Sequence, residues 1–254
     1  MKITFLGTGT SHGVPMINCS CEVCSSSLPE DKRLRTSLWI QSAAKSILID
    51  TSPDLRQQAL RYGIDKIDAI FYTHEHADHV NGIDEIRPFF RNSNTAISIY
   101  WHQRVKDEVS KRFSYIFSAN PYPGMPQIND TVLSDFQNFQ LDELLITPLP
   151  IRHGNLDIFG YKINEMVYIT DASGISEETL AKIKGCEILI LNALRNQSHF
   201  THLSLTQALE YVEKISPKKA FFIHMSHEIG LHEKVNQTLP LHVQLAYDGL
   251  NFEI

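Results

Sequence analysis

Short apolar runs alternate with amphipathic stretches along most of the chain, and this alternation predicts strands separated by helices. Runs of about four to eight residues rich in Ile, Leu, Val and aromatic side chains are typical of buried strands. The expected strands cover residues 2–7, 36–50, 67–72, 143–150, 158–163, 167–170, 187–192 and 219–224, the second being a pair of strands broken near residues 42–45.

Capping signals at the ends of the amphipathic stretches predict helices between these strands. A Ser at the N-cap accepts a hydrogen bond from one of the backbone N–H groups that the start of a helix leaves unpaired. Pro is typical of the first turn because it has no N–H, and Gly is typical of the position just past the last turn. A Gln three residues after an N-cap Ser forms a reciprocal capping box. The expected helices are residues 53–62 (Ser52 at the N-cap, Pro53, then Gly63), 176–184 (ended by Gly185) and 204–215 (a capping box of Ser204 and Gln207).

The order of these elements repeats along the chain. Residues 47–54 (ILIDTSPD) lead from a strand through an Asp and small residues into a helix, which a strand and a His-rich loop follow. Residues 167–174 (VYITDASG) begin the same series in the second half. The repeat predicts two sheets with helices outside them, although ordinary α/β alternation also produces such a pattern.

Composition narrows the class of protein. A chain of 254 residues, 43% of them apolar, has room for one large α/β domain or two small ones, and we expect a single domain over residues 1–254. The apolar start at residues 1–6 is too short for a signal peptide, and no run approaches the ~18–20 apolar residues of a membrane span, so we expect a cytoplasmic protein. The net charge of −6, without a basic run, counts against a long nucleic acid as the main partner.

The candidate chemistry is concentrated in residues 72–82, YTHEHADHVNG, at the end of an expected strand. Imidazole nitrogens and carboxylate oxygens are ligands that Zn²⁺, Mn²⁺ and Fe ions accept, and a buried strand gives such a loop a rigid base. A solvated His-rich turn is the alternative. The HxHxDH pattern supplies His74, His76, Asp78 and His79 as candidate metal ligands.

Three further candidate ligands end apolar strands elsewhere. His153 follows PLPIR, Asp171 follows VYIT and His224 follows KKAFFI. Any one of them alone would more often be a structural residue with satisfied hydrogen bonds. Together with the HxHxDH loop they provide enough ligands for a pair of metal sites.

This set of ligands resembles that of the metallo-β-lactamase superfamily of dinuclear metallohydrolases, and the resemblance runs from Gly7 almost to the C-terminus. It implies a metal-dependent hydrolase with an α/β fold, the four-layer αββα sandwich. It also implies that Asp50 orients the metal ligands from beneath the His loop, although a carboxylate at a helix entry is the alternative. By this resemblance one metal is bound by His74, His76 and His153, the other by Asp78, His79 and His224, and Asp171 bridges the two metals.

The cysteine loop NCSCEVC is a candidate for a separate metal site. The CxCxxC spacing in a chain expected to be cytoplasmic favours metal binding over disulfides, with three reduced surface thiols as the alternative. A closed tetrahedral zinc site needs a fourth ligand, and His227 is the candidate. The set of Cys19, Cys21, Cys24 and His227 resembles the structural zinc site of the phosphoribosyl cyclic phosphate phosphodiesterases of phosphonate degradation, and the pyrroloquinoline quinone biosynthesis B proteins have a similar loop.

His202 lies directly before the capped helix, in HFTHLSLTQAL. In the cyclic phosphodiesterases and the related tRNA-processing endonucleases a His at the matching position assists the leaving oxygen, so the resemblance implies a general acid here. Packing at the helix N-terminus is the alternative. The segments PLPIRHGNLDIFGYKI and VYITDASG also resemble the cyclic phosphodiesterases.

The expected function is that of a dinuclear metal-dependent phosphodiesterase that hydrolyses a small, cyclic phosphate diester of the phosphoribosyl type. Two adjacent metals lower the pKa of a bridging water toward ~7 and neutralise phosphate oxygens as charge builds up. Asp78 would bind metal and orient the resulting hydroxide, and His202 would protonate the leaving oxygen. Zn, Mn and Fe all suit the active-site ligands, whereas the cysteine loop suits one structural Zn.

Other functions stay open on the sequence alone. An ester, thioester or lactone hydrolase would use the same metals but would give His202 no clear role. A tRNA-processing nuclease would need a Gly-rich or basic insertion, which this sequence lacks, and an oxygen-reducing diiron protein carries a Glu where this chain has His76. A non-catalytic binding protein on the same scaffold is a further alternative. The family resemblance is compatible with a homodimer, and the Pro- and aromatic-rich residues 113–130 are a candidate lid or oligomer contact, or a plain surface loop.

Overall fold

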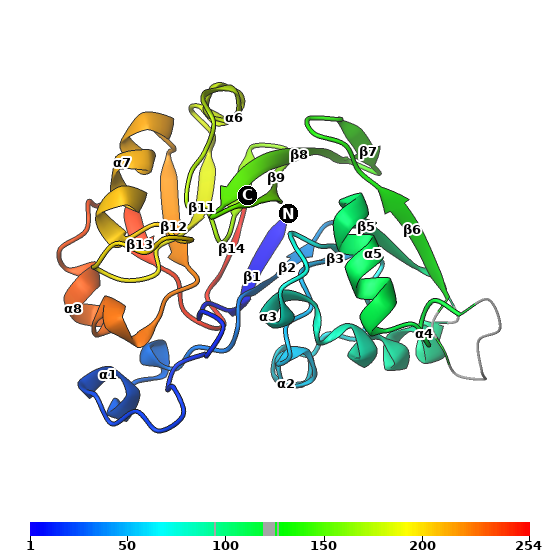
Figure 1. The fold of residues 1–254 in the computed structure, drawn as a ribbon, viewed down its shortest axis with the longest axis horizontal. Coiled ribbons are helices and arrows are strands. Elements are labelled where there is room, and N and C mark those ends of the chain that lie inside the picture. Colours follow the sequence, from blue (N-terminus) through cyan, green and yellow to red (C-terminus); the bar gives the residue numbers. More distant parts are fainter. Residues whose placement is uncertain (94, 119–124, 126) are drawn as a thin grey trace. The chain divides into compact units, whose positions relative to one another are not determined.

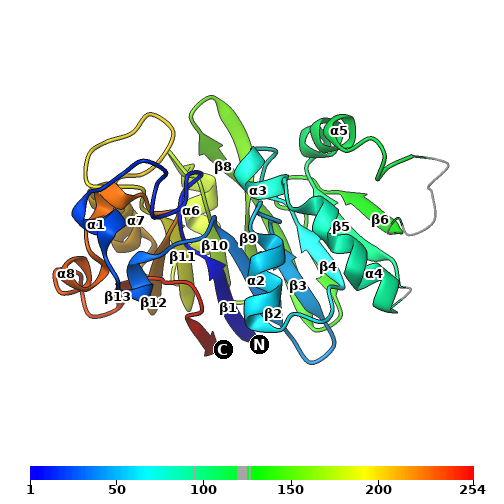
Figure 2. The same cartoon turned by 90° about the horizontal axis from the view of Figure 1, so that it is seen from below.

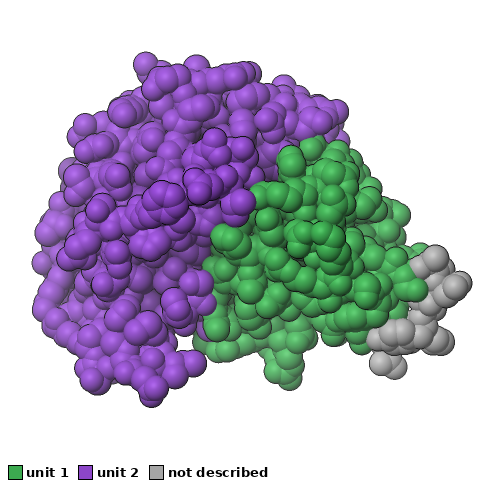
Figure 3. All heavy atoms as spheres, in the orientation of Figure 1, with its two compact units in different colours: residues 1–7, 35–133, 249–254 green, residues 8–34, 134–248 purple. Residues whose placement is uncertain are grey.

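The computed structural model describes residues 1–93, 95–118, 125 and 127–254. The chain forms two compact units, which Figure 3 shows in different colours. Unit 1 consists of residues 1–7, 35–133 and 249–254, and unit 2 of residues 8–34 and 134–248. The single domain expected over residues 1–254 stays a prediction.

Unit 1 contains a seven-stranded mixed sheet with helices on it. Its helices α2, α4 and α5 contribute to one hydrophobic core with the central strands, and α2 and α4 lie along these strands in Figure 2. The strand order is β14 (Asn251–Glu253), β1 (Lys2–Gly7), β2 (Ser37–Gln41), β3 (Ser46–Ile49), β4 (Ala69–Phe71), β5 (Ile97–Trp101) and β6 (Ile128–Val132), and the helices are α2 (Leu55–Tyr62), α3 (Ala77–Val80), α4 (Arg87–Ser93) and α5 (Gln103–Arg112), with a 3₁₀ turn at Ile83–Ile86.

Unit 2 contains the second seven-stranded mixed sheet. The strand order is β13 (Val243–Leu245), β12 (Lys219–Ile223), β11 (Ile188–Asn192), β10 (Met166–Ile169), β9 (Leu156–Ile163), β8 (Leu144–His153) and β7 (Phe139–Leu141), and the helices are α1 (Glu22–Ser25), α6 (Glu177–Ile183), α7 (Leu205–Ile215) and α8 (His232–Asn236), with 3₁₀ turns at Pro29–Asp31 and His227–Ile229.

The two sheets share one pairing scheme, which confirms the repeat expected from the sequence. Most of their strands are labelled in Figure 1. In unit 1 the pairs are antiparallel from β14 to β3 and parallel from β3 to β6. In unit 2 they are antiparallel from β7 to β10 and parallel from β10 to β13. Because loops at the carboxyl ends of neighbouring parallel strands meet at one edge of a sheet, each unit gathers its polar loops there.

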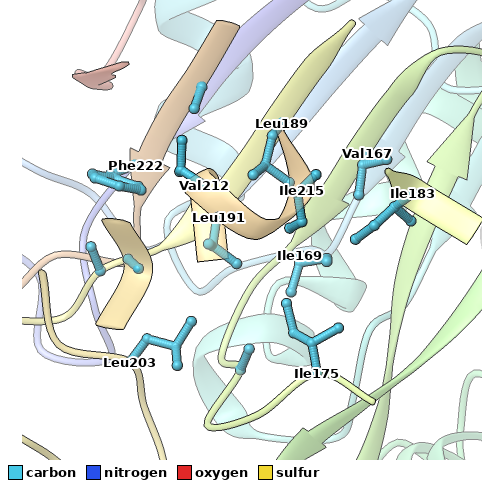
Figure 4. Close-up of a cluster of buried hydrophobic side chains, with 14 of the residues drawn as sticks. Val167, Ile169, Ile175, Ile183, Leu189, Leu191, Leu203, Val212, Ile215 and Phe222 are labelled. Atoms are coloured by element: carbon cyan, nitrogen blue, oxygen red, sulfur yellow. The ribbon is translucent and has the colours of Figure 1, made fainter. Parts of the chain in front are cut away.

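The core of unit 2 fixes the strands that carry these loops. Val212 and Ile215, one turn apart on α7, belong to the same buried cluster as Leu189, Leu191 and Phe222 of the sheet (Figure 4). Burying each such side chain contributes roughly 1.5–3 kcal/mol. The capping box expected at Ser204 and Gln207 is present and sets where α7 begins.

The start of α2 differs from the prediction. The helix begins at Leu55, and Asp54 rather than Ser52 occupies the N-cap. The Ser52 hydroxyl accepts a hydrogen bond from the Asp54 backbone N–H at 3.1 Å and donates one to the Gln58 side chain, also at 3.1 Å. Ser52 therefore stabilises a local turn that delays the helix, so the predicted N-cap was wrong.

Between Asn81 and Leu141 the sequence predicted little, and here the 3₁₀ turn at Ile83–Ile86, α4, β5, α5, β6 and β7 are additional elements. Of the candidate lid at 113–130, residues 119–124 and 126 lie outside the described residues, and its last part belongs to β6, which begins at Ile128. Among the helices that the structure describes, none is long and apolar enough to cross a membrane.

Candidate metal centre

The HxHxDH loop of unit 1 folds so that its donor atoms lie at metal-ligand spacing. It follows β4, and α3 begins within it. His74 Nε2 lies 3.0 Å from His76 Nδ1, and His79 Nε2 lies 3.2 Å from Asp78 Oδ2. Ligands about 2.0–2.2 Å from one tetrahedral ion are about 3.3–3.6 Å apart, so these pairs fit a metal with little movement.

Asp50, directly after β3, holds the loop from below. It accepts hydrogen bonds from the Thr73 backbone N–H and hydroxyl, both at 2.8 Å, and from His79 Nδ1 at 2.7 Å. Burial raises the pKa of Asp50, while His79 and Thr73 lower it. Because Nδ1 of His79 donates to this carboxylate, Nε2 presents its lone pair on the opposite side of the ring, where a metal ligand needs it.

Unit 2 gathers the other candidate ligands at the carboxyl ends of its strands. His153 ends β8, Asp171 follows β10 and His224 follows β12. His224 Nδ1 lies 3.1 Å from Asp171 Oδ1, and His202 Nδ1 lies 3.8 Å from Asp171 Oδ2. Donor atoms of His153, Asp171 and His202 all lie within 4.8 Å of one another. His153 donates from Nδ1 to the Thr201 carbonyl at 2.8 Å, which leaves Nε2 as its lone-pair nitrogen.

Three of these positions have a left-handed backbone that non-glycine residues seldom adopt. The φ angles are 62° at Asp50, 56° at Asp171 and 56° at His224. Such conformations cost on the order of 1–3 kcal/mol each and are concentrated at functional sites, where surrounding contacts enforce them. At Asp171 the Asn192 side chain does so, because it both accepts from the Ala172 N–H at 2.7 Å and donates to the Ala172 carbonyl at 3.1 Å.

His202 packs against other histidines of unit 2. Its ring stacks on His224 with centroids 5.0 Å apart and lies 4.9 Å from His153. Burial lowers the pKa of His202 to about 3, and the Asp171 charge opposes that shift. The side chain is therefore neutral at neutral pH and carries one N–H donor.

The sequence did not indicate three residues that support the candidate ligands, namely Thr10, Thr73 and Asn192. The Thr10 hydroxyl lies 3.1 Å from His224 Nε2, while Thr73 and Asn192 hold Asp50 and the backbone after Asp171 as described above. Thr and Asn are common in loops, and no spacing in the sequence marks them as partners of residues far along the chain.

The cysteine loop forms a compact cluster within unit 2. Cys19 Sγ and Cys21 Sγ lie 3.3 and 3.2 Å from His227 Nδ1, and donor atoms of these residues and Cys24 all lie within 4.8 Å of one another. With Zn–S of about 2.3 Å and Zn–N of about 2.0 Å, tetrahedral sulfur–nitrogen distances are about 3.5 Å, so the cluster fits zinc. The pKa of the Cys21 thiol is lowered to about 6, mainly by a hydrogen bond from the Cys24 N–H and to a smaller extent by the contact with His227. Burial raises the pKa of the Cys24 thiol to about 11.

The predicted residues are thus distributed over both units. Within each unit the donor atoms lie close together, and the nitrogen and oxygen sets suit Zn, Mn or Fe, whereas the thiolate set suits zinc. Unit 1 contributes His74, His76, Asp78 and His79, and unit 2 contributes His153, Asp171, His202, His224 and the cysteine cluster.

The sequence of the chain matches a known family and a curated relative. The sequence profile of the β-lactamase superfamily domain matches residues 45–225. A protein of Porphyromonas gingivalis named octanoyltransferase is 43% identical over 252 residues, which are 98% of this chain and 51% of that protein. The chain therefore spans about half of the length of this relative.

Solved structures match over nearly the full length of both chains. A diphosphatase from the PhnP family has a TM-score of 0.93 and 41% identity, over 100% of this chain and 97% of that one. The Zn²⁺-bound PqqB from Methylobacterium extorquens has a TM-score of 0.82 and 19% identity, over 100% of both chains, which is a likeness of fold.

Proposed function

The chain belongs to the metallo-β-lactamase superfamily and is a metal-dependent hydrolase with the αββα fold predicted for it, and from this premise we propose that it hydrolyses a phosphate diester bond in a small molecule. The 41% identity to a diphosphatase of the PhnP family supports phosphorus as the centre that is attacked. The name octanoyltransferase belongs to a protein about twice as long, and that name alone assigns no acyl transfer to this chain.

The position of His202 is the observation that carries this proposal. Its ring lies against His224 and faces the Asp171 carboxylate, although the residue itself belongs to the loop before α7. An imidazole beside the candidate ligands that the proposed metal sites do not use is suited to the leaving oxygen of a phosphate ester. A lactone or ester hydrolase on the same ligands would give this side chain no comparable task.

The proposal keeps the ligands predicted from the sequence. Bound divalent metals of the Zn, Mn or Fe type would supply charge neutralisation at phosphate oxygens and would acidify water. The first metal would use His74, His76 and His153, and the second Asp78, His79 and His224, with Asp171 shared. The cysteine cluster, Cys19, Cys21, Cys24 and His227, would hold one structural zinc.

The chain's own groups then define the hydrolytic step. A bond forms between the oxygen of water and phosphorus, and the bond from phosphorus to the leaving oxygen breaks. Asp78 orients the attacking water, and His202 hydrogen-bonds the leaving oxygen and relays a proton to it, so that both protons of the consumed water end on the products. The negative phosphate beside His202 favours the protonated ring, which burial alone disfavours. The resemblance to the phosphoribosyl cyclic phosphodiesterases makes a cyclic ribose phosphate the first substrate to test.

The test compares His202→Ala with the wild type on two leaving groups after reloading with Mn²⁺ or Zn²⁺. On a ribose cyclic phosphate, whose leaving group is a poorly acidic alcohol, kcat should fall about 10²–10⁴-fold. On bis(4-nitrophenyl) phosphate, whose leaving group needs little protonation, the loss should be much smaller. Metal content should stay unchanged.

The exposed His242 provides a matched control, since it belongs to none of the candidate ligand clusters and His242→Ala should leave both rates unchanged. Equal losses on both diesters would show that His202 does not act on the leaving oxygen. Turnover of lactones or carboxyl esters, without turnover of either diester, would overturn the phosphodiesterase proposal itself.

A further inference from the structure

The helix α5 makes two contacts with Glu75, the residue between the candidate ligands His74 and His76. Arg112 Nη1 donates to the Glu75 carbonyl at 2.6 Å, and Arg104 Nη1 lies 3.2 Å from Glu75 Oε1. The two arginines are about two helical turns apart on α5. Two charged side chains of one helix thus converge on a residue that binds no metal in the proposed sites.

The contact with Arg112 acts on the backbone of the metal loop. The Glu75 carbonyl belongs to the peptide bond that joins Glu75 to His76, and this peptide is planar, so the hydrogen bond fixes where the His76 backbone begins. A hydrogen bond from an ionised donor is about twice as strong as a neutral one. Because His76 Nδ1 lies 3.0 Å from His74 Nε2, a rotation of this peptide changes the distance between two donor atoms that one ion must share.

The contact with Arg104 involves a carboxylate that is costly to bury. Glu75 is 8% exposed, and its Oε2 is buried without a hydrogen-bond partner among the described residues. The Arg104 side chain is 30% exposed, so it would keep its contact with solvent if Glu75 were neutral. A buried carboxylate with one ionic partner gains little stability over a neutral group of the same size, so its presence calls for another explanation.

The helix α5 gives the two arginines a rigid base. Val105 and Val109 are fully buried, in the same hydrophobic cluster as Tyr72, which lies two residues before the HxHxDH motif. Lys106 pairs with Asp130 of β6 at 2.5 Å. The helix is thereby fixed to the sheet that carries the metal loop, so its arginines hold the loop from a rigid element.

We propose that Glu75 is a positioning residue of the first metal site, held by Arg112 and Arg104. Through it, α5 sets the distance between the donor atoms of His74 and His76. This rests on the metal ligands of the proposed function and not on the identity of the substrate. Both arginines act on the metal loop rather than on the reacting atoms, so loss of the Arg112 contact should weaken metal binding without unfolding the chain.

Arg112→Gln tests this role in the metal-loaded protein. The shorter side chain does not reach the Glu75 carbonyl, and we expect the affinity for one active-site metal to fall about 10–100-fold, as is typical of groups that orient metal ligands. Chelator competition with metal analysis measures the affinity. The sign is informative, because removal of a positive charge beside a cation site would by charge alone raise the affinity.

Lys111→Gln is the matched control, since Lys111 also lies in the last turn of α5 and pairs with Glu108 at 2.7 Å. It removes the same charge from the same helix end and should leave metal affinity at the wild-type level or slightly above it. Arg112→Lys keeps a charged donor and should restore part of the affinity. Equal affinities in Arg112→Gln and Lys111→Gln would overturn the positioning role.

Hydrogen exchange of the chelator-treated protein separates positioning from a general loss of stability. The backbone N–H groups of His79 and Val80 bond to the His76 carbonyl, at 3.0 and 3.2 Å, so they report on this loop. In Arg112→Gln they should exchange faster, while exchange in β1 to β3 and the free energy of unfolding in urea change little. Faster exchange throughout unit 1 would show that the arginine only stabilises the fold, and the inference would fail.

Neither measurement requires turnover, which keeps this inference distinct from the phosphodiesterase proposal. A wild type that hydrolyses no diester, together with weaker metal binding in Arg112→Gln, would overturn the proposed function alone. Active wild-type protein whose metal affinity is unaffected by Arg112→Gln would overturn the positioning role alone. A wild type that binds zinc only at the cysteine cluster would overturn both.

Discussion

At the scale of single residues, the candidate ligands depend on supporting contacts from distant parts of the chain. His74, His76, Asp78 and His79 lie within one short motif, and Asp171 and His224 end apolar strands where an idle polar residue would be out of place. Their supporting contacts come from residues far apart in the chain, such as Asn192 at the backbone after Asp171 and Thr73 at Asp50. Partners of this kind depend on which strands become neighbours, which a local pattern does not contain.

Asp50 is the support whose removal is most informative. It is fully buried and accepts the His79 Nδ1–H at 2.7 Å, so it fixes the ring orientation of a candidate ligand. Asp50→Asn keeps the size but removes the charge, and we expect metal affinity to fall about 10–100-fold while the chain still folds. Chelator competition with metal analysis measures the affinity, and circular dichroism checks the fold.

Asp54→Asn is the matched control, since Asp54 lies in the same unit and pairs with Arg35 at 2.9 Å instead of with a candidate ligand. It makes the same change of charge and should leave metal affinity as in the wild type. An Asp50→Asn protein that kept full affinity, or an Asp54→Asn protein that lost as much, would contradict the orienting role.

At the scale of elements, the prediction succeeded where periodicity and capping agreed. The Ser204 capping box and the αL glycine after α2, Gly63, are as expected. The helix α5 was not predicted because its buried face consists of Val105 and Val109 alone. The strands β13 and β14 were not predicted because each is three residues long, which is too short for a pattern of apolar and polar positions. Short elements owe their existence to neighbouring strands rather than to their own sequence.

The cysteine loop is an element whose small hydrophobic cluster consists of Val14, Val23 and Cys24, with partly buried neighbours. A core of this size contributes little, so we expect a structural zinc to hold the loop. In a Cys21→Ser protein the metal count should fall from about three per chain to about two, with the active-site metals retained. Cys21 is exposed, so lost packing explains none of that change.

Cys186→Ala is the control for the zinc count. Cys186 is the buried cysteine outside the loop, and its thiol has a pKa raised to about 11 by burial, as for an inert core residue. Mass spectrometry of the intact protein under native conditions should therefore find the full metal count in this variant. A Cys21→Ser protein that also kept the full count would show that the loop does not bind zinc.

At the scale of the whole molecule, the repeat in the sequence corresponds to the shared pairing scheme of the two sheets, and Asp50 and Asp171 follow the equivalent strands β3 and β10. The homodimer and the cytoplasmic location stay predictions. What the sequence did not indicate is the polar network that joins the two ends of unit 2. Arg33 donates to the Thr8 hydroxyl at 2.9 Å and to the Ala246 carbonyl at 2.7 Å, and Thr8 donates to Asp248 at 2.8 Å.

His232 also belongs to this network, because its Nδ1 lies 3.1 Å from Arg33 Nη2. Asp248 and His232 are titratable groups with opposite effects on the pH dependence of stability. Burial raises the pKa of Asp248 to about 6, against the charge of Arg33. Burial and then the Arg33 charge lower the pKa of His232 to about 4, against the opposing charges of Glu30 and Asp31. Asp248 contributes to the free energy of unfolding at low pH, and this contribution is lost as pH rises through about 6. His232 contributes to the free energy of unfolding at high pH, and this contribution is lost as pH falls through about 4. Between about pH 4 and about pH 6, the two contributions to stability change in opposite directions and largely offset each other in the wild type.

In the Asp248→Asn variant, the effect of His232 on the pH dependence of stability should therefore be no longer offset. Relative to the wild type, its free energy of unfolding should fall on going from about pH 7 to about pH 5 by on the order of 1 kcal/mol, because acidification no longer relieves a buried carboxylate. His232→Gln should show the opposite sign, and the double variant should return toward the wild-type pH dependence. Urea unfolding of all four proteins at both pH values measures these differences, and other groups, the metal ligands included, titrate alike in each and cancel. If the two single variants shifted with the same sign, Asp248 and His232 would not form an opposing pair, and the network would act on stability through its hydrogen bonds alone.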